Sequence, residues 1–258
     1  EPGAVAALPP TARHPAGSAS ERRAADAWLW QFVNKPLLDA PLTRYVYRPL
    51  ARPLTRLFVR LPFSPNQITI ASILIGQLGC VIASRPGYGL HLLGISIMAW
   101  VSGLLDNVDG ELARLRLQGS KLGAWLDAVS DDFLRLCLMV ALGSHVAPAF
   151  PGLPIWPIAI ASAVLTASTM APMYWYCVRV LGTPNTQHYM KVLNGGGRGL
   201  ALGRIVAGRD FVDAGAFVLA VAGLPIVAVI GFAIGAVAGF AVVIPAHVAA
   251  VRGGARFA

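Results

Sequence analysis

Residues 105–132 read LDNVDGELARLRLQGSKLGAWLDAVSDD, and this stretch decides how the rest of the chain is interpreted. It holds six of the 12 acidic residues of the 258-residue chain, and long apolar stretches lie on both sides of it. An ionisable group at membrane depth is costly, so a cluster of such groups indicates a functional site. The acids are Asp106, Asp109, Glu111, Asp127, Asp131 and Asp132.

The composition places the chain in a membrane. The apolar share is 56%, the charged share is 13% and the mean hydropathy is +0.63. In a soluble domain, the apolar share is roughly 45–50% and the charged share is about 25%. These values exclude a disordered chain, a coiled coil and a soluble globular domain, and they predict an all-α integral membrane protein. Six apolar stretches predict six transmembrane helices, at about 67–84, 90–112, 122–147, 153–179, 210–224 and 226–251.

The net charge of +9 follows a membrane pattern rather than a nucleic-acid pattern. If the N-terminus lies inside, the inner segments and inner helix ends hold 20 of the 21 Lys and Arg residues, and only Arg85 falls in an outer loop. Basic residues collect on the cytoplasmic side of membrane proteins. We therefore expect a multi-pass protein of the inner (cytoplasmic) membrane, with the N-terminus and the active site facing the cytoplasm and no nucleic-acid partner.

Three segments make up the expected organisation. Residues 1–22 are typical of a flexible linker or tail, residues 23–61 of interfacial amphipathic helices that precede the spans, and residues 62–258 of the six-span domain. Pro49 and Pro53 are expected to bend or break the juxtamembrane helix. Alternatively, some arginines of this segment bind substrate phosphate. The arginines recur every four residues, at Arg44, Arg48, Arg52, Arg56 and Arg60.

Cysteine and histidine offer no metal site. The three cysteines, Cys80, Cys137 and Cys177, lie inside apolar runs, so we interpret them as packing residues rather than disulfide or zinc ligands. The five histidines are interpreted as non-ligands because none lies in the acidic cluster. They are His14, His91, His145, His188 and His247.

The spacing of the acids predicts a carboxylate site. Asp106 and Asp109 are three residues apart and Asp127 and Asp131 are four apart, so each pair lies on one face of a helix. The chain between the pairs is long enough to turn back, which sets four carboxylates against each other. Unpaired carboxylates repel in an apolar pocket. Hard divalent cations such as magnesium, manganese or calcium resolve that conflict better than zinc does.

Neighbouring residues point to a phosphate-bearing substrate. Arg114 can clamp phosphate oxygens beside the metals. Gly110, Ala113 and Gly123 remove side chains where a bulky ligand needs close approach to the backbone. The alternative is a proton or ion path through the carboxylates, as in a transporter.

The pattern Asp106-x2-Asp109-Gly110-x2-Ala113-Arg114-x8-Gly123-x3-Asp127-x3-Asp131 resembles, without a gap or substitution, the signature of the CDP-alcohol phosphotransferase (CDP-alcohol phosphatidyltransferase) family. The resemblance covers roughly residues 35–251. It implies six helices, a homodimer and a polar cavity open to the cytoplasm. It also implies a reaction in which a CDP-linked alcohol donor and an acceptor alcohol give a phosphodiester and CMP.

The resemblance also implies residue roles. Asp106, Asp109, Asp127 and Asp131 would bind two divalent ions, Mg²⁺ or Mn²⁺, and Asp131 would also be the general base for the acceptor hydroxyl. Gly110, Ala113, Arg114 and Gly123 would line the CDP pocket.

A second stretch, Ser64-Pro65-Asn66-Gln67-Ile68-Thr69, is similar to the family's Pro-Asn-x-Ile-Thr sequence at the start of the first span. It would bring Asn66 and Thr69 near the nucleotide. The alternative interpretation of this stretch is a simple helix cap.

One position departs from many members of the family. They have Arg directly after the fourth motif Asp, and this chain has Asp132 there. We expect Asp132 and Arg135 at the acceptor site, because an Arg within a span must face the cavity. The alternative is a salt bridge from Arg135 to Asp131 or Asp132. A wider basic acceptor site would draw on Arg135, Arg179, Lys191, Arg198, Arg204 and Arg209.

The segments around residues 34–44 and 125–132 also look like a subgroup fused behind a nucleotidyltransferase domain and related to di-myo-inositol phosphate synthases. A nucleotidyltransferase domain before residue 1 would make the CDP donor. Whether the product is a lipid or a polar phosphodiester stays open. A membrane prenyltransferase, whose Asp pairs lie far apart in the chain, and a carboxylate-lined transporter, which needs polar groups in both halves of the chain, are the alternatives.

Overall fold

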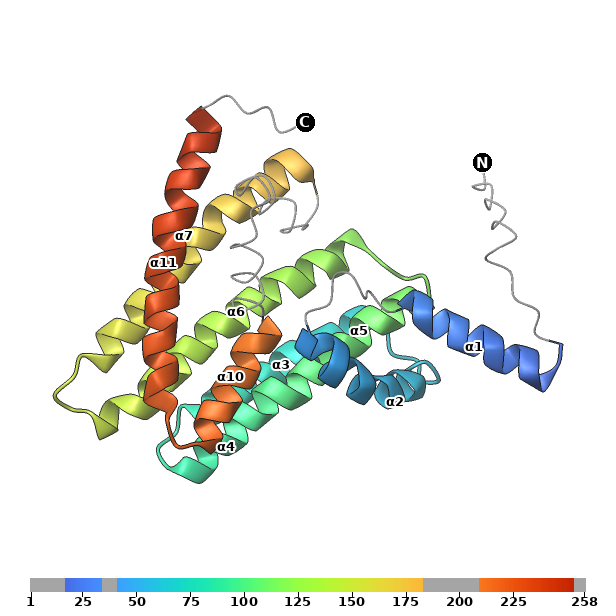
Figure 1. The fold of residues 1–258 in the computed structure, drawn as a ribbon, viewed down its shortest axis with the longest axis horizontal. Helices are drawn as coiled ribbons and strands as arrows, with labels where there is room; N and C mark the ends of the chain where they lie inside the picture. Colours follow the sequence, from blue (N-terminus) through green and yellow to red (C-terminus); the bar gives the residue numbers. More distant parts are fainter. Residues whose placement is uncertain (1–16, 34–40, 183–208, 253–258) are drawn as a thin grey trace.

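The computed structural model describes residues 17–33, 41–182 and 209–252 (Figure 1). Within these ranges the chain is helical and has no strand. Helix α1 (Ala19–Val33) comes first, and a π-helical turn, η2 (Thr43–Tyr47), leads into α2 (Arg48–Phe58). Residues 19–22, the end of the expected tail, belong to α1, and residues 1–16 lie outside the described residues.

Five helical segments are long and apolar enough to cross a membrane. They are α3 (Pro65–Ala83), the continuous segment of α4 (Tyr88–Ser96), η3 (Ile97–Ser102) and α5 (Gly103–Leu115), α6 (Lys121–Val146) with η4 (Ala147–Ala149), α7 (Ile155–Tyr176) with η5 (Cys177–Leu181), and α11 (Pro225–Arg252).

The multi-pass prediction is thereby confirmed, with five candidate spans among the described residues rather than six. The stretch expected to span at 210–224 forms α10 (Arg209–Val221), and its apolar part, Phe211–Val221, is shorter than the other five. A helix needs about 20 apolar residues to cross the hydrocarbon core. A sixth span therefore stays a prediction.

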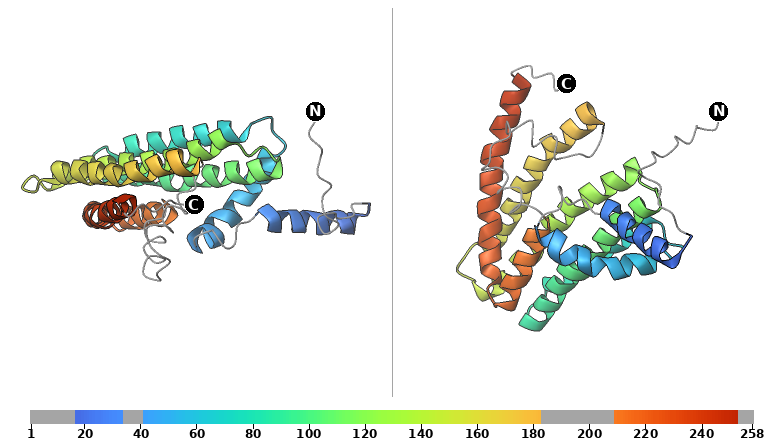
Figure 2. Two further views of the ribbon diagram at one scale, coloured as in Figure 1. Left: turned by 90° about the horizontal axis from the view of Figure 1, so that it is seen from above. Right: turned by 45° about the vertical axis from the view of Figure 1, so that its right-hand side comes forward.

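The helices form two layers at different heights (Figure 2). One layer holds α3, α4, α5, α6 and α7, and α10 and α11 lie against it, with α11 beside α7 and α10 beside α4. Helix α2 packs on α5 at the other end of the molecule, and α1 extends beyond it. Apolar residues from both layers, including Cys80, Leu138, Leu142, Ala216 and Val229, form the main core.

The first span begins with a reciprocal cap. The Gln67 backbone N–H donates to Ser64 Oγ at 3.3 Å, and the Ser64 N–H donates to Gln67 Oε1 at 2.9 Å. Pro65 occupies the first turn, where no helical hydrogen bond is lost. The cap prediction is confirmed for Ser64 and Gln67. The cap fixes where α3 begins and therefore the positions of Asn66 and Thr69 in its first turns.

The five arginines that recur every four residues between 44 and 60 do not share one environment in the structure. Arg48 is buried, Arg52 is half-buried, and Arg44, Arg56 and Arg60 are exposed. A spacing of four residues exceeds the 3.6 residues of a helical turn, so successive arginines drift around the axis. Pro49 lies in the first turn of α2, and Pro53 lies inside it without ending it. The prolines therefore do not break the helix, which continues from the π-helical turn η2 into α2 with helical backbone angles at Tyr47 and Arg48.

One arginine fastens the end of α2 to the second span. Arg116, just past α5, donates from Nη2 to the carbonyl oxygens of Phe58 at 3.0 Å, Val59 at 3.0 Å and Leu61 at 2.6 Å. A cation suits these carbonyls because the last turn of a helix leaves its acceptors unpaired. The connection from α2 to α3 is therefore held against the end of α5.

The opposite end of this layer is built from close backbone contacts and two histidines. A Cβ on Gly94 of α4 would lie 2.2 Å from the Ala83 nitrogen, so only glycine permits this approach. The rings of His91 and His145 stack with centroids 3.8 Å apart. Their Nδ1 atoms lie 2.8 Å from the Ala83 carbonyl oxygen and 2.9 Å from the Arg85 carbonyl oxygen respectively. Since a carbonyl only accepts, each Nδ1 carries the proton.

Candidate active site

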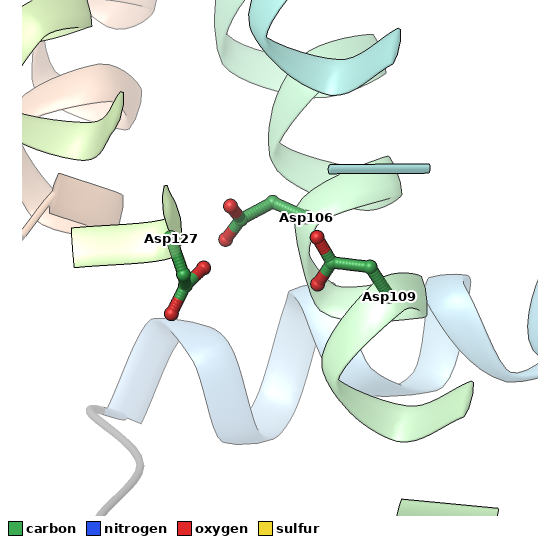
Figure 3. A group of neighbouring side chains, drawn as sticks. All are labelled: Asp106, Asp109 and Asp127. Carbon is green, nitrogen blue, oxygen red and sulfur yellow. The ribbon is translucent and has the colours of Figure 1, made fainter. Parts of the chain in front are cut away.

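Three carboxylates meet between the second and third spans. Asp106 and Asp109 lie on one face of α5, Asp127 comes from α6, and each offers an oxygen within 4.8 Å of the others. Figure 3 shows the three side chains converging from the two helices. Clustered carboxylate oxygens are the ligands that Mg²⁺ and Mn²⁺ prefer. The residues present therefore fit a hard divalent cation.

A short connection between the helices makes this meeting possible. Leu117 adopts a left-handed conformation with φ 53°, and the Gln118 N–H donates to the Ala113 carbonyl oxygen at 2.9 Å, closing the end of α5. Ser120 then caps α6 by accepting from the Gly123 N–H at 2.9 Å. The turn reverses the chain within a few residues and sets Asp127 opposite Asp106 and Asp109.

The first span orients one of these carboxylates. Thr69, one turn into α3, donates from Oγ1 to Asp109 Oδ2. Asp109 is only 5% exposed and Thr69 4%. A hydroxyl fixed in this way holds the Asp109 carboxylate at one orientation, as hydrogen-bond partners behind a metal site do for its ligands.

The carboxylates open into a pocket of about 660 Å³. All six residues expected to bind the nucleotide line it: Asn66, Thr69, Gly110, Ala113, Arg114 and Gly123. The volume is within the range of roughly 300–1,000 Å³ that holds small molecules. The structure thus brings these residues together with Asp106, Asp109 and Asp127, while their roles stay predictions.

The two motif glycines make room for protein side chains. A Cβ on Gly123 would lie 2.8 Å from Asn66 Oδ1, and a Cβ on Gly110 would lie 3.3 Å from Arg114 Nη1. Asn66 and Arg114 therefore fill the space next to the glycines and face the pocket from there. Arg114 also donates from Nε to the Val33 carbonyl oxygen at the end of α1, at 2.9 Å.

Asp131, the fourth motif acid, lies outside the group of three. It forms an ion pair with Arg209 at the start of α10, and the same guanidinium contacts Asp106 Oδ1 at 2.8 Å and Asp213 Oδ2 at 3.4 Å. Arg209 also donates to Ser102 Oγ at 3.2 Å. The acids thus form two groups that share Asp106. One is the cluster with Asp109 and Asp127, which could hold a cation, and the other is the set of acids bound to Arg209.

The acceptor predictions have different surroundings. Asp132 accepts a hydrogen bond from the Tyr174 hydroxyl of α7 at 2.6 Å. Arg135 is half-buried one turn past Asp131 on α6 and is not among the residues that line the pocket. Of the wider basic set, Arg179 and Arg209 are described, and Lys191, Arg198 and Arg204 lie outside the described residues.

Sequence reasoning missed two partners of the site. Tyr174 carried no signal, because its contact with Asp132 depends on how α7 packs against α6. Arg48 lines the pocket as well, but the sequence includes it only as one of five arginines that either lie on the membrane surface or, alternatively, bind substrate phosphate, and does not single it out. Its place one turn before the buried Ala51 and two turns before the buried Thr55 is the signal that it belongs to an inward face.

A family model described as CDP-alcohol phosphatidyltransferase matches residues 63–243, which include the capped start of the first span and every carboxylate described above. The chain belongs to the CDP-alcohol phosphatidyltransferase family. The resemblance seen in the motif is therefore confirmed over most of the chain.

Curated relatives agree with this family. The chain is 32% identical over 116 residues to the bifunctional IPC transferase and DIPP synthase of Aquifex aeolicus, which covers 45% of this chain and 26% of that protein. It is 31% identical over 91 residues to the phosphatidylinositol phosphate synthase of Mycobacteroides abscessus, covering 35% of this chain and 40% of that protein. The chain thus matches about a quarter of the Aquifex relative and less than half of the Mycobacteroides relative.

Proposed function

We propose that this CDP-alcohol phosphatidyltransferase family member transfers a substituted phosphate group from a CDP-linked alcohol to a hydroxyl of an acceptor alcohol and releases CMP. The observation that carries the proposal is the pocket in which three carboxylates from two helices lie beside Arg114, within the segment that matches the family. That match favours this reaction over the transporter and the prenyltransferase.

The acidic residues would hold two divalent cations, Mg²⁺ or Mn²⁺. The first site is Asp106, Asp109 and Asp127, and Asp131 contributes to the second. A divalent cation there supplies neutralisation of charge on the phosphate oxygens during transfer. Thr69 keeps Asp109 in place for this purpose.

The remaining pocket residues bind and orient the donor. Arg114 donates to the diphosphate, since a guanidinium matches phosphate oxygens with paired hydrogen bonds. Asn66, Gly110, Ala113 and Gly123 form the wall against which the CDP part lies. A donor held in this way presents one face of the phosphorus attached to the donor alcohol.

Asp131 is the proposed general base. The acceptor hydroxyl gives its proton to the Asp131 carboxylate, its oxygen forms the new bond to the phosphorus attached to the donor alcohol, and the bond from that phosphorus to CMP breaks. The ion pair with Arg209 holds the carboxylate beside Asp106. Asp132, held by Tyr174, and Arg135 are proposed to contact the acceptor.

The membrane arrangement belongs to the same proposal. α10 is the sixth span, residues 23–61 lie on the membrane surface before the six-span domain of residues 62–258, and the pocket opens to the cytoplasm. The exposed arginines on and around α2, Arg44, Arg56 and Arg60, support the surface position, because they suit anionic lipid headgroups. We also propose a homodimer and, since the matched relatives include bifunctional proteins, a nucleotidyltransferase partner that makes the donor.

The test is CMP release by the purified protein in detergent with Mg²⁺. The donors are CDP-diacylglycerol, CDP-inositol and CDP-glycerol, each paired with polyols and polyol phosphates, and each pair is repeated with EDTA. We expect Mg²⁺-dependent release with one donor and one acceptor, which also settles whether the product is a lipid. Failure to bind CDP in the presence of Mg²⁺ or Mn²⁺ would overturn the proposal.

A further inference from the structure

A charged residue inside the motif takes no part in the carboxylate group described above. Glu111 follows Gly110 on α5, its side chain is 0% exposed, and it does not line the pocket. A carboxylate in such a place is strongly disfavoured unless a partner charge and hydrogen bonds compensate it. Glu111 therefore needs a positive charge and hydrogen-bond donors, and α2 is the helix that packs against α5 here.

Both partners come from α2. Arg48 Nη1 donates to Glu111 Oε1 at 3.1 Å, and Thr55 Oγ1 donates to Glu111 Oε2 at 2.7 Å. Each carboxylate oxygen thus has a donor from the same helix, at positions seven residues and about two turns apart. Ala51 lies between them, is 0% exposed, and packs with Val108 and Leu112 of α5. Glu111 fixes both the position and the register of α2 along α5.

The same arginine reaches the nucleotide pocket. Arg48 lines it together with Asn66, Asp106 and Arg114. Among the described lining residues, Arg48 is the only one that precedes the first span. Its side chain is 9% exposed, so it is a guanidinium held in one place at the pocket wall rather than a surface group. Figure 1 shows how α2 lies alongside α5 at the end of the bundle that holds the site.

We propose that Arg48 is a donor-contacting residue that binds the anionic diphosphate, and that Glu111 is the positioning residue that aims it. The inference rests on the proposed function, because it takes the diphosphate of a CDP-linked donor as the ligand. An arginine already held by a carboxylate loses little further side-chain freedom when it binds phosphate. The juxtamembrane helix is then part of the nucleotide site.

CDP binding in the presence of Mg²⁺, measured by calorimetry on detergent-purified protein, tests this. Arg48→Gln is expected to raise the Kd for CDP on the order of 10-fold, because a hydrogen bond to a charged group is lost. Glu111→Gln is expected to raise it by a similar factor, although Glu111 does not line the pocket. The Arg48→Gln/Glu111→Gln double variant should have a Kd for CDP no higher than that of the single variant with the higher Kd, because both changes act through Arg48.

Controls separate this role from a structural one. Arg85→Gln removes an exposed charge at the far end of the molecule and should leave the Kd unchanged. Should the single variants fail to fold, Arg48→Met/Glu111→Leu removes both buried charges together, a replacement that proteins often tolerate. This variant is expected to elute as the parent protein does and to show the same loss of affinity on the order of 10-fold.

The outcomes separate the two proposals. If the parent protein binds CDP and the folded variants bind it equally well, the role of Arg48 and Glu111 is overturned and the proposed function stands. Additive losses in the double variant would contradict the positioning role of Glu111 and leave Arg48 as an independent contact. If the parent protein itself binds no CDP, both proposals fail together.

Discussion

The two ends of the helical layer bury polar side chains in different ways. At the pocket end, side chains from different helices bind one another: Thr69 to Asp109, Arg48 to Glu111 and Arg209 to Asp106. At the far end, His91 and His145 each bind a nearby backbone carbonyl and stack on each other. The His145 contact joins α6 to the end of the first span through a neutral carbonyl group, which offers no charge to a ligand. Charged side chains that meet across helices form a site in which a charged ligand can bind to one of them in place of its protein partner.

Replacing the proposed base should have the largest effect at the pocket end. Asp131→Asn keeps the size of the side chain but cannot take a proton, so turnover should fall by roughly 10²- to 10⁴-fold, the usual contribution of general base catalysis. CDP and divalent-cation binding should remain detectable by calorimetry. Full activity in this variant would remove Asp131 from the base role.

A change in the group of three carboxylates should affect the metal as well as the rate. Asp109→Asn removes one anionic ligand, and we expect both Mn²⁺ affinity and CMP release to fall by more than about 100-fold, since even partners behind a metal site are worth 10–100-fold. Paramagnetic resonance of bound Mn²⁺ is the readout. Asp26→Asn, an exposed carboxylate on α1, serves as the control. Unchanged Mn²⁺ affinity would exclude this group as the cation site.

Arg114→Ala tests the anion-binding side of the pocket. The donor Kd should rise by about 10- to 100-fold, the value of hydrogen bonds to a charged group. The variant is compared with Arg85→Gln, which removes a positive charge at the far end. Unchanged donor affinity in Arg114→Ala would place Arg114 outside the nucleotide site.

Gly123→Ala should have a smaller effect of the same kind. The new Cβ would lie 2.8 Å from Asn66 Oδ1, so Asn66 has to shift. We expect CDP affinity to fall several-fold while the protein stays folded. Gly231→Ala on α11 is the matched control, because a Cβ there meets nothing within 4 Å and Gly231 does not line the pocket. Equal affinity in both variants would mean that the position of Asn66 does not matter for CDP.

The far end should respond in stability alone. His91→Phe keeps a ring for the contact with His145 and loses the hydrogen bond to the Ala83 carbonyl, so we expect a loss of about 1 kcal/mol in the free energy of unfolding. The thermal midpoint should fall by about 2–4 °C, with CMP release unchanged. A large loss of CMP release would show that the two ends are coupled and would contradict the view that the histidine end contributes to stability alone.

Helix positions could largely be predicted from the sequence, because apolar length determines which segments can cross a membrane. The expected stretches 67–84 and 226–251 correspond to α3 and α11 within a few residues. The stretch 210–224 shows the limit of this argument. It corresponds to α10, which ends at Val221 before the Gly223 turn at φ 69°, but its apolar part, Phe211–Val221, is shorter than the other candidate spans, so that a span there stays a prediction.

The candidate site could be predicted where one helix carries the information. Spacings of three and four residues state which side chains share a face, and this placed Asp106 and Asp109 together. Contacts between helices distant in the chain are set by packing, so the ion pair of Asp131 with Arg209 and the hydrogen bond of Asp132 with Tyr174 left no trace in the spacing. The repeat of four residues in the arginines of residues 44–60 likewise does not tell which of them turns inward, because the contact of Arg48 with Glu111 depends on how α2 packs against α5.

The bridge from α2 to Glu111 also bears on where the protein can be cut. The family match begins at residue 63, whereas the donors to Glu111 lie at Arg48 and Thr55. A truncated chain that started at residue 63 would lose both donors to Glu111 and would uncover the face of α5, including Val108 and Leu112, on which α2 packs. It would also remove Phe58 and Leu61, whose carbonyl oxygens bind Arg116. We therefore expect stable folding of the spans to require α2, although α2 lies upstream of residue 63, where the family match begins.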